Sequence, residues 1–72
     1  MSDINIGKVI EEELRSQHRT VVWLAEKLNC NRTNIYKIFQ RQSIDTELLL
    51  RISKALNRNF FDKYIQLLQS NP

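Results

Sequence analysis

Apolar residues recur every three or four positions through most of this chain, the spacing that places them along one face of an α-helix. Five stretches of this kind are separated by short polar segments. Glycine and proline occur once each in the 72 residues, and the proline is the last residue. A sheet protein that depends on tight turns is therefore excluded, and the pattern predicts an all-α fold of five helices without strands.

Polar residues that commonly cap helices lie directly before the apolar stretches. Such a side chain accepts a hydrogen bond from a backbone N–H group that the helix leaves free. Two asparagines, Asn29 and Asn57, follow the second and fourth stretches, where the left-handed conformation that Asn tolerates would end a helix. The predicted N-caps are Asn5, Thr20, Asn31, Asp45 and Asn59. The predicted helices cover residues 6–17, 21–28, 32–40, 46–56 and 60–68.

The size of the chain limits it to one domain. We expect residues 1–72 to form a single domain with its core in residues 6–68 and with frayed ends at 1–4 and 69–72. One cysteine cannot form an intramolecular disulfide, and no apolar run approaches the roughly 20 residues that span a bilayer. The first residues lack the basic and apolar regions of a signal peptide, so we expect a cytoplasmic protein.

Basic residues are concentrated in the middle of the chain. The net charge is +3 overall, yet residues 15–41 hold six basic residues and a single acid, Glu26. A local positive field attracts polyanions and speeds encounter with them. A solvated basic face without a partner is the alternative interpretation. The six basic residues are Arg15, Arg19, Lys27, Arg32, Lys37 and Arg41.

The second and third predicted helices are joined by only three residues, 29–31. Two short helices with so short a connection must cross steeply, as in the helix-turn-helix, whose second helix enters the DNA major groove. Apolar residues lie where the packing of such a unit requires them. These residues are Leu24, Ala25, Leu28, Cys30, Ile35 and Ile38.

Around this predicted helix-turn-helix, the sequence resembles the phage-repressor-type (Cro/cI, XRE) helix-turn-helix family. The resembling strings are TVVWLAEKLNCNRTNIYKIF, residues 20–39, and DTELLLRISKALN, residues 45–57. With the first predicted helix, the resemblance covers roughly residues 6–56. It implies a lambda-repressor-like DNA-binding domain of five helices. It also implies a sequence-specific transcriptional regulator, for which repression by blocking polymerase is the simplest mechanism.

The resemblance assigns base contacts to the exposed face of the third predicted helix. The matching positions here are Arg32, Thr33, Tyr36 and Lys37. Arg and Lys can donate hydrogen bonds to guanine O6 and N7, and Thr can contact a thymine methyl group. Their chemistry therefore suits the readout of double-stranded DNA.

Phosphate contacts are assigned to the start of the second helix and to the segment after the third. Thr20 and Arg41 match these two locations, and Gln40 lies beside Arg41 on the same face. Contacts of this kind fix the register of the protein on the duplex and carry no sequence preference. The family often has Gln at the start of the second helix, where this chain has Val21, so Thr20 or a backbone N–H group must supply that contact.

Two apolar residues of the second predicted helix lie off its buried stripe, Val22 and Trp23. One interpretation is that both cover the edge of the core. The alternative is a contact patch that Val22 and Trp23 form with Tyr36. In that case the fold would serve as a protein-interaction adaptor.

The fifth predicted helix carries an apolar stripe of Phe61, Tyr64, Ile65 and Leu68 at helical spacing, with Phe60 and Leu67 off that stripe. These additional apolar residues have two interpretations: a homodimer contact through Phe60, Tyr64 and Leu67, or the edge of the core. Repressors of this family dimerise near this end and read half-sites about one DNA turn apart. A third possibility is antitoxin-like regulation, with a partner protein docked on the same helix.

Other functions lack a signal in the sequence. No nucleophile–base pair, second carboxylate cluster or Gly-rich phosphate loop is visible, so we expect no enzyme activity and no cofactor. His18 stands alone and Cys30 reads as a small hydrophobic residue, so we expect no metal site. No small-molecule ligand and no membrane contact are expected.

Overall fold

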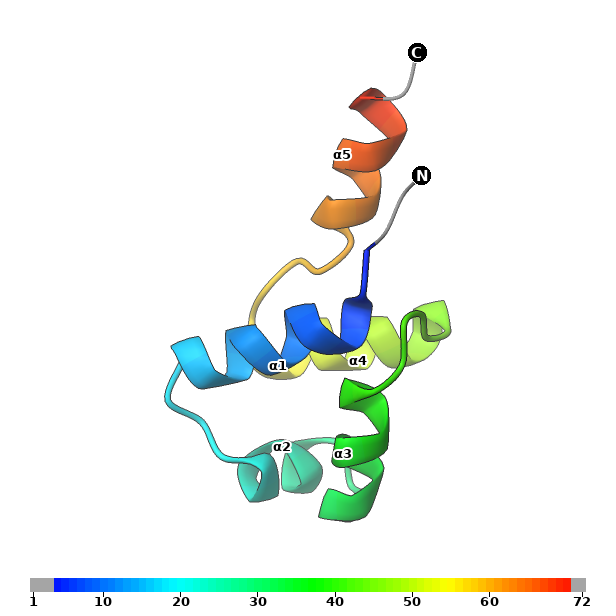
Figure 1. The fold of residues 1–72 in the computed structure, drawn as a ribbon. Helices are drawn as coiled ribbons and strands as arrows, with labels where there is room; N and C mark the ends of the chain where they lie inside the picture. Colours follow the sequence, from blue (N-terminus) through cyan, green and yellow to red (C-terminus); the bar gives the residue numbers. More distant parts are fainter. Residues whose placement is uncertain (1–3, 71–72) are drawn as a thin grey trace.

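Five α-helices account for the secondary structure of the computed structural model, which describes residues 4–70 (Figure 1). No strand forms within these residues, so the predicted all-α fold is confirmed. The boundaries of the first four helices lie within one residue of those predicted. The helices are α1 (Ile6–Ser16), α2 (Val21–Lys27), α3 (Arg32–Phe39), α4 (Thr46–Leu56) and α5 (Asp62–Ser70).

The predicted caps fix the starts of α1 to α4. In each case the side-chain oxygen of the cap accepts a hydrogen bond from the backbone N–H three residues further on, as for Thr20 Oγ1 and Trp23 N at 3.0 Å. Asn29 and Asn57 adopt φ angles of 58° and 53° at the ends of α2 and α4, which confirms their left-handed conformation. His18, between α1 and α2, has a φ of 58° that the sequence analysis did not predict.

The core lies between α1, α2, α3 and α4. Its side chains come from the predicted apolar stripes, together with one residue of the segment after α4. Full burial of each large apolar side chain contributes about 1.5–3 kcal/mol. The buried residues are Ile6, Ile10, Leu14, Leu24, Ala25, Leu28, Ile35, Ile38, Leu49, Ile52, Leu56 and Phe60.

The start of α1 is bonded to the segment that follows α3. The backbone N–H groups of Ile6 and Gly7 donate hydrogen bonds to the carbonyl oxygens of Gln42 at 3.0 Å and Arg41 at 2.9 Å. Gly7 is buried, and a Cβ atom there would lie 2.7 Å from the Arg41 carbonyl oxygen and still closer to those of Ile38 and Phe39. Glycine therefore permits the backbone contact that fixes where α3 ends.

The segment before α5 differs from its prediction. Asn59 Oδ1 accepts a hydrogen bond from Phe61 N at 3.0 Å, and α5 begins at Asp62, two residues later than expected. Phe60 precedes the helix, is 0% exposed and donates from its backbone N–H to Ser53 Oγ at 3.4 Å. The core interpretation is therefore correct for Phe60, and its assignment to a homodimer surface on the fifth helix is wrong because its side chain is buried.

Beyond Phe60, α5 extends away from the other helices, at the opposite end of the molecule from α2 and α3 (Figure 1). The molecule is accordingly 41 Å long and about 20 Å across. Phe61 packs partly buried against the core, whereas Tyr64, Ile65 and Leu68 are exposed, Leu68 to 79%, so the predicted stripe is covered only at its first residue. The helix continues to Ser70, although fraying was expected from residue 69.

At the N-terminal end, Ile4 packs partly buried against the core instead of fraying. The fraying predicted for residues 1–3 and 71–72 lies outside the described residues.

Candidate nucleic-acid interface

The outward face of α3 presents every residue predicted to contact bases. Arg32, Thr33, Tyr36 and Lys37 are all exposed. Two buried isoleucines on the opposite face, Ile35 and Ile38, hold the helix against the core. The structure thus brings together four side chains that are consecutive or one turn apart on a single exposed face.

Tyr36 is 53% exposed, yet one edge of its ring is supported. Its ring lies 6.4 Å from that of Phe39 in an edge-to-face arrangement with an interplanar angle of 83°. Aromatic pairs favour this geometry. The contact fixes the position of the Tyr36 ring on the surface, while its other side is open to solvent or a partner.

Thr20 combines an exposed position with a structural bond. Its Oγ1 accepts the hydrogen bond from Trp23 N that caps α2. A hydroxyl group also carries one proton that it can donate outward. The cap and a phosphate contact are therefore compatible at this residue.

Arg41 and Gln40, at the end of α3, are exposed as predicted. The Arg41 backbone is fixed on both sides, because its N–H donates to the Ile38 carbonyl at 3.0 Å and its carbonyl accepts from Gly7. The backbone of Arg41 is therefore fixed, and its guanidinium group is exposed to solvent.

Trp23 lies between two cations that the sequence analysis did not link to it. The guanidinium carbon of Arg19 is 4.5 Å from the ring centroid, and Lys27 Nζ is 5.7 Å away. Cations over an indole face are attracted by its electron-rich π system. Since Trp23 is half-buried against the core, the core-edge interpretation fits it, and the helical spacing of residues 19, 23 and 27 could have revealed the contact. Val22 remains 46% exposed.

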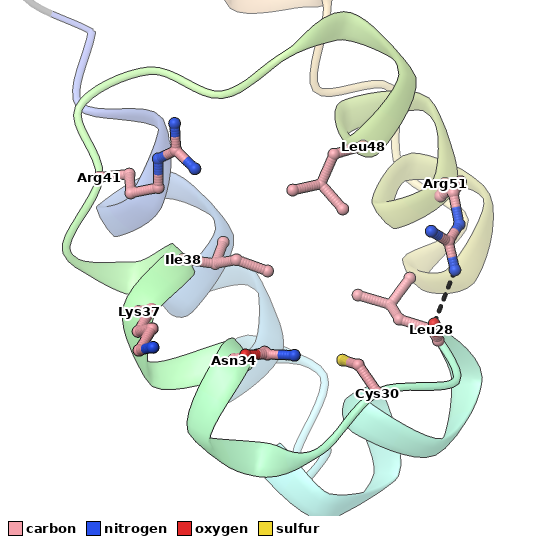
Figure 2. Close-up of a pocket in the computed structure, with 8 residues that line it drawn as sticks. All are labelled: Leu28, Cys30, Asn34, Lys37, Ile38, Arg41, Leu48 and Arg51. Carbon is pink, nitrogen blue, oxygen red and sulfur yellow. Dashed lines mark hydrogen bonds between the residues drawn. The ribbon is translucent and has the colours of Figure 1, made fainter.

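Arg51 of α4 is the cation that sequence reasoning missed. Its Nη2 donates a 2.6 Å hydrogen bond to the carbonyl oxygen of Leu28, at the end of α2. No local pattern predicts this contact, because it depends on how α4 packs against α2. The bond brings a third positive charge to the side of the molecule that carries Lys37 and Arg41 (Figure 2).

The cations of this interface are free of carboxylates within residues 4–70. Ion pairs in that part of the chain join Arg15 to Glu11 at 2.8 Å and Arg58 to Glu13. Both pairs lie on α1 and the segment before α5. The charges of Arg32, Lys37 and Arg41 are therefore available to an external anion.

Among the described residues, no group of three His, Cys, Asp or Glu side chains is placed to hold a metal ion. None of the helices in residues 4–70 combines the length and the apolar character that a membrane span needs.

Comparison with known proteins finds no matching family model, no matching curated protein and no matching solved structure. The functional assignment therefore depends on the residues and their arrangement.

Proposed function

We propose that this protein is a sequence-specific DNA-binding regulator of transcription in which α2 and α3 form a helix-turn-helix. The observation that carries the proposal is the outward face of α3. It exposes two cations, a threonine and a supported tyrosine, with no carboxylate paired to either cation in the described chain. The connection of α2 to α3 is short, and the two helices pack against each other.

In this proposal α3 enters the major groove. Arg32, Thr33, Tyr36 and Lys37 read base edges, because bidentate donors and methyl contacts distinguish base pairs there. Thr20, Gln40 and Arg41 contact the flanking phosphates and set the register. The role is non-enzymatic, requires no cofactor and belongs in the cytoplasm.

The exposed stripe of α5 supports self-association in the same proposal. Tyr64 and Ile65 line one side of a helix that leaves the body at the end away from α2 and α3 (Figure 1). Two copies joined there read two half-sites about 34 Å apart, one turn of DNA, provided that the α5 contact leaves both α3 helices facing the same side of the duplex. Repression would follow because a bound dimer blocks polymerase from the same duplex.

The test is an NMR titration of the labelled protein with a random 20-base-pair duplex at two salt concentrations. Non-specific affinity of such proteins is about 10⁻⁴ to 10⁻⁶ M and weakens as salt rises. We expect salt-sensitive shifts at Thr20, across 32–37 and at Arg41. The outer face of α1, at Glu12, is the internal control and should not shift. Absence of shifts at low salt would overturn the DNA proposal.

A protein-interaction adaptor is the second candidate, favoured by the exposure of Val22 and Tyr36 on neighbouring helices. Val22→Ser distinguishes the two functions. It leaves the affinity for DNA unchanged if α3 reads the duplex, whereas it abolishes capture of a partner protein if the patch is the binding surface.

A further inference from the structure

A pocket of about 320 Å³ lies where the end of α2, α3 and α4 meet (Figure 2). Three large apolar side chains, Leu28, Ile38 and Leu48, form its apolar floor, and Cys30 and the polar Asn34 line it as well. Leu28 and Ile38 belong to the buried core, and Leu48 packs against that core from the first turns of α4. The floor is therefore a rigid part of the fold. Its volume is at the lower end of the range of about 300–1,000 Å³ for small-molecule sites.

Three cations line the same pocket, Lys37, Arg41 and Arg51. They come from α3, from the segment after it and from α4, so that Lys37 and Arg41 lie on one side of the pocket and Arg51 on the other (Figure 2). No Asp or Glu is among the residues that line the pocket. Excess positive charge over an apolar floor is complementary to a ligand with one anionic end and one apolar end.

Arg51 is held in place for such a ligand. Its bond to the Leu28 carbonyl uses one of the five N–H donors of a guanidinium group. The others remain for an anion, and a guanidinium fork matches phosphate and carboxylate oxygens well. The carbonyl bond reduces the freedom that Arg51 would otherwise lose on binding.

We propose that this pocket binds a small organic anion whose phosphate or carboxylate contacts Arg51, with Lys37 and Arg41 adding to its electrostatic attraction, and whose aryl or short acyl body covers Leu28, Ile38 and Leu48. This differs from the expectation, drawn from the sequence, that no small molecule binds. That expectation did not consider Arg51, whose side chain lines the pocket from α4.

Three probes test the two halves of the proposed ligand. Phenyl phosphate carries both the anion and the ring, inorganic phosphate carries only the anion, and benzyl alcohol carries only the ring. In an NMR titration that follows methyl and backbone signals, phenyl phosphate should shift Leu28, Ile38 and Leu48 together with Arg51. Its affinity should exceed that of either fragment by about tenfold, the effect of burying one ring. Equal affinity for phenyl and inorganic phosphate would overturn the proposal, because the apolar floor would then contribute nothing. Shifts located elsewhere would overturn it too.

Two variants and one control test the cations. Arg41→Gln leaves its backbone bonds intact, and we expect it to weaken phenyl phosphate about fivefold, the loss of one nearby positive charge. Arg51→Gln should weaken it at least as much, with thermal unfolding recorded because the Leu28 bond is also removed. Lys54→Gln removes an exposed cation from the same helix outside the pocket and should change nothing. Equal effects of all three would mean that net charge alone attracts the anion.

The consequence for DNA rests on the proposed function, because Lys37 and Arg41 belong to both surfaces. Phenyl phosphate should weaken binding of a fluorescent duplex to the wild type and have less effect on Arg51→Gln. Benzyl alcohol should have no effect. If the duplex never binds, the proposed function fails, while the direct titration still decides whether the pocket binds the anion. If phenyl phosphate and the duplex both bind without competing, the proposed effect of the anion on DNA binding is wrong.

Discussion

The body of the molecule, formed by α1 to α4, and the last helix, α5, carry the same kind of apolar stripe. In the body this stripe is buried, whereas in α5 most of it is exposed. In α2 the stripe residues Leu24 and Ala25 are buried, whereas in α5 Ile65 and Leu68 are exposed. Both stripes have helical spacing, so the difference lies in the connections. The short turn after α2 brings its stripe onto α3, whereas the segment after α4 buries Phe60 and then directs α5 away (Figure 1). Periodicity thus predicts a helix but not what covers it.

Of the changes predicted here, Phe60→Ala should lower the free energy of unfolding the most. The side chain is fully buried at the junction between the body and α5, and such truncations cost about 3–5 kcal/mol because a cavity remains. Urea unfolding followed by circular dichroism measures the loss. Leu68→Ala is the matched control on α5 and should change stability by less than about 0.5 kcal/mol. Similar losses for both would mean that α5 packs on the body.

Gly7→Ala should be the next most damaging change. The added methyl group would meet three backbone carbonyls at the end of α3, and overpacking of this kind typically costs about 1–3 kcal/mol. The free energy of unfolding and the chemical shifts of residues 38–42 report it together. Ala55→Gly, at a half-buried position of α4, is the comparison for a glycine–alanine difference inside a helix. Unchanged shifts at 38–42 would contradict the contact.

Lys37→Ala and Arg41→Ala test whether these two cations contact different parts of the DNA, the first a base and the second a phosphate. If Lys37 reads a base, its removal should cost about 1–3 kcal/mol at a preferred site and less on random DNA. Arg41→Ala should instead weaken all duplexes alike and reduce the salt slope by about one unit. Fluorescence anisotropy with both DNAs at several salt concentrations measures these effects. Equal losses on both DNAs for both variants would refute the division into base and phosphate contacts.

Ile65→Ser with Leu68→Ser should have the smallest effect on stability, because both residues are exposed in the single chain. We expect a change within about 0.5 kcal/mol at low protein concentration. Sedimentation should show loss of any self-association, and affinity for a single half-site should stay unchanged. Wild type that is monomeric at every concentration would remove α5 from the dimer proposal.

The accuracy of the sequence predictions follows from the range of the interactions involved. The boundaries of α1 to α4 depend on caps such as Thr20 and Asn31, which bond to residues three positions away, so the sequence suffices. The start of α5 was misplaced because Asn59 bonds to Phe61 and because Phe60 is drawn into the core. The second of these causes is a tertiary effect.

The candidate interface shows the same limit. Residues one turn apart on α3 share a face by geometry alone, which is why Arg32, Thr33, Tyr36 and Lys37 were grouped correctly as exposed. Arg51 could not be included, because its bond to Leu28 joins two residues that are 23 positions apart in sequence. The contact of Arg19 with the Trp23 ring is an intermediate case. The two residues are four positions apart, so the helical spacing was visible in the sequence, but the contact itself was not predicted.

The bonds from Ile6 and Gly7 to the segment after α3 tie the first residues of the fold to the end of the helix proposed to read DNA. These two amide protons can exchange with solvent only when that junction opens, so their exchange rates report the opening of the end of α3. If a duplex binds α3 and stabilises it, exchange at Gly7 should slow, although Gly7 itself is buried. Exchange at the first turn of α1 therefore measures how firmly α3 is held.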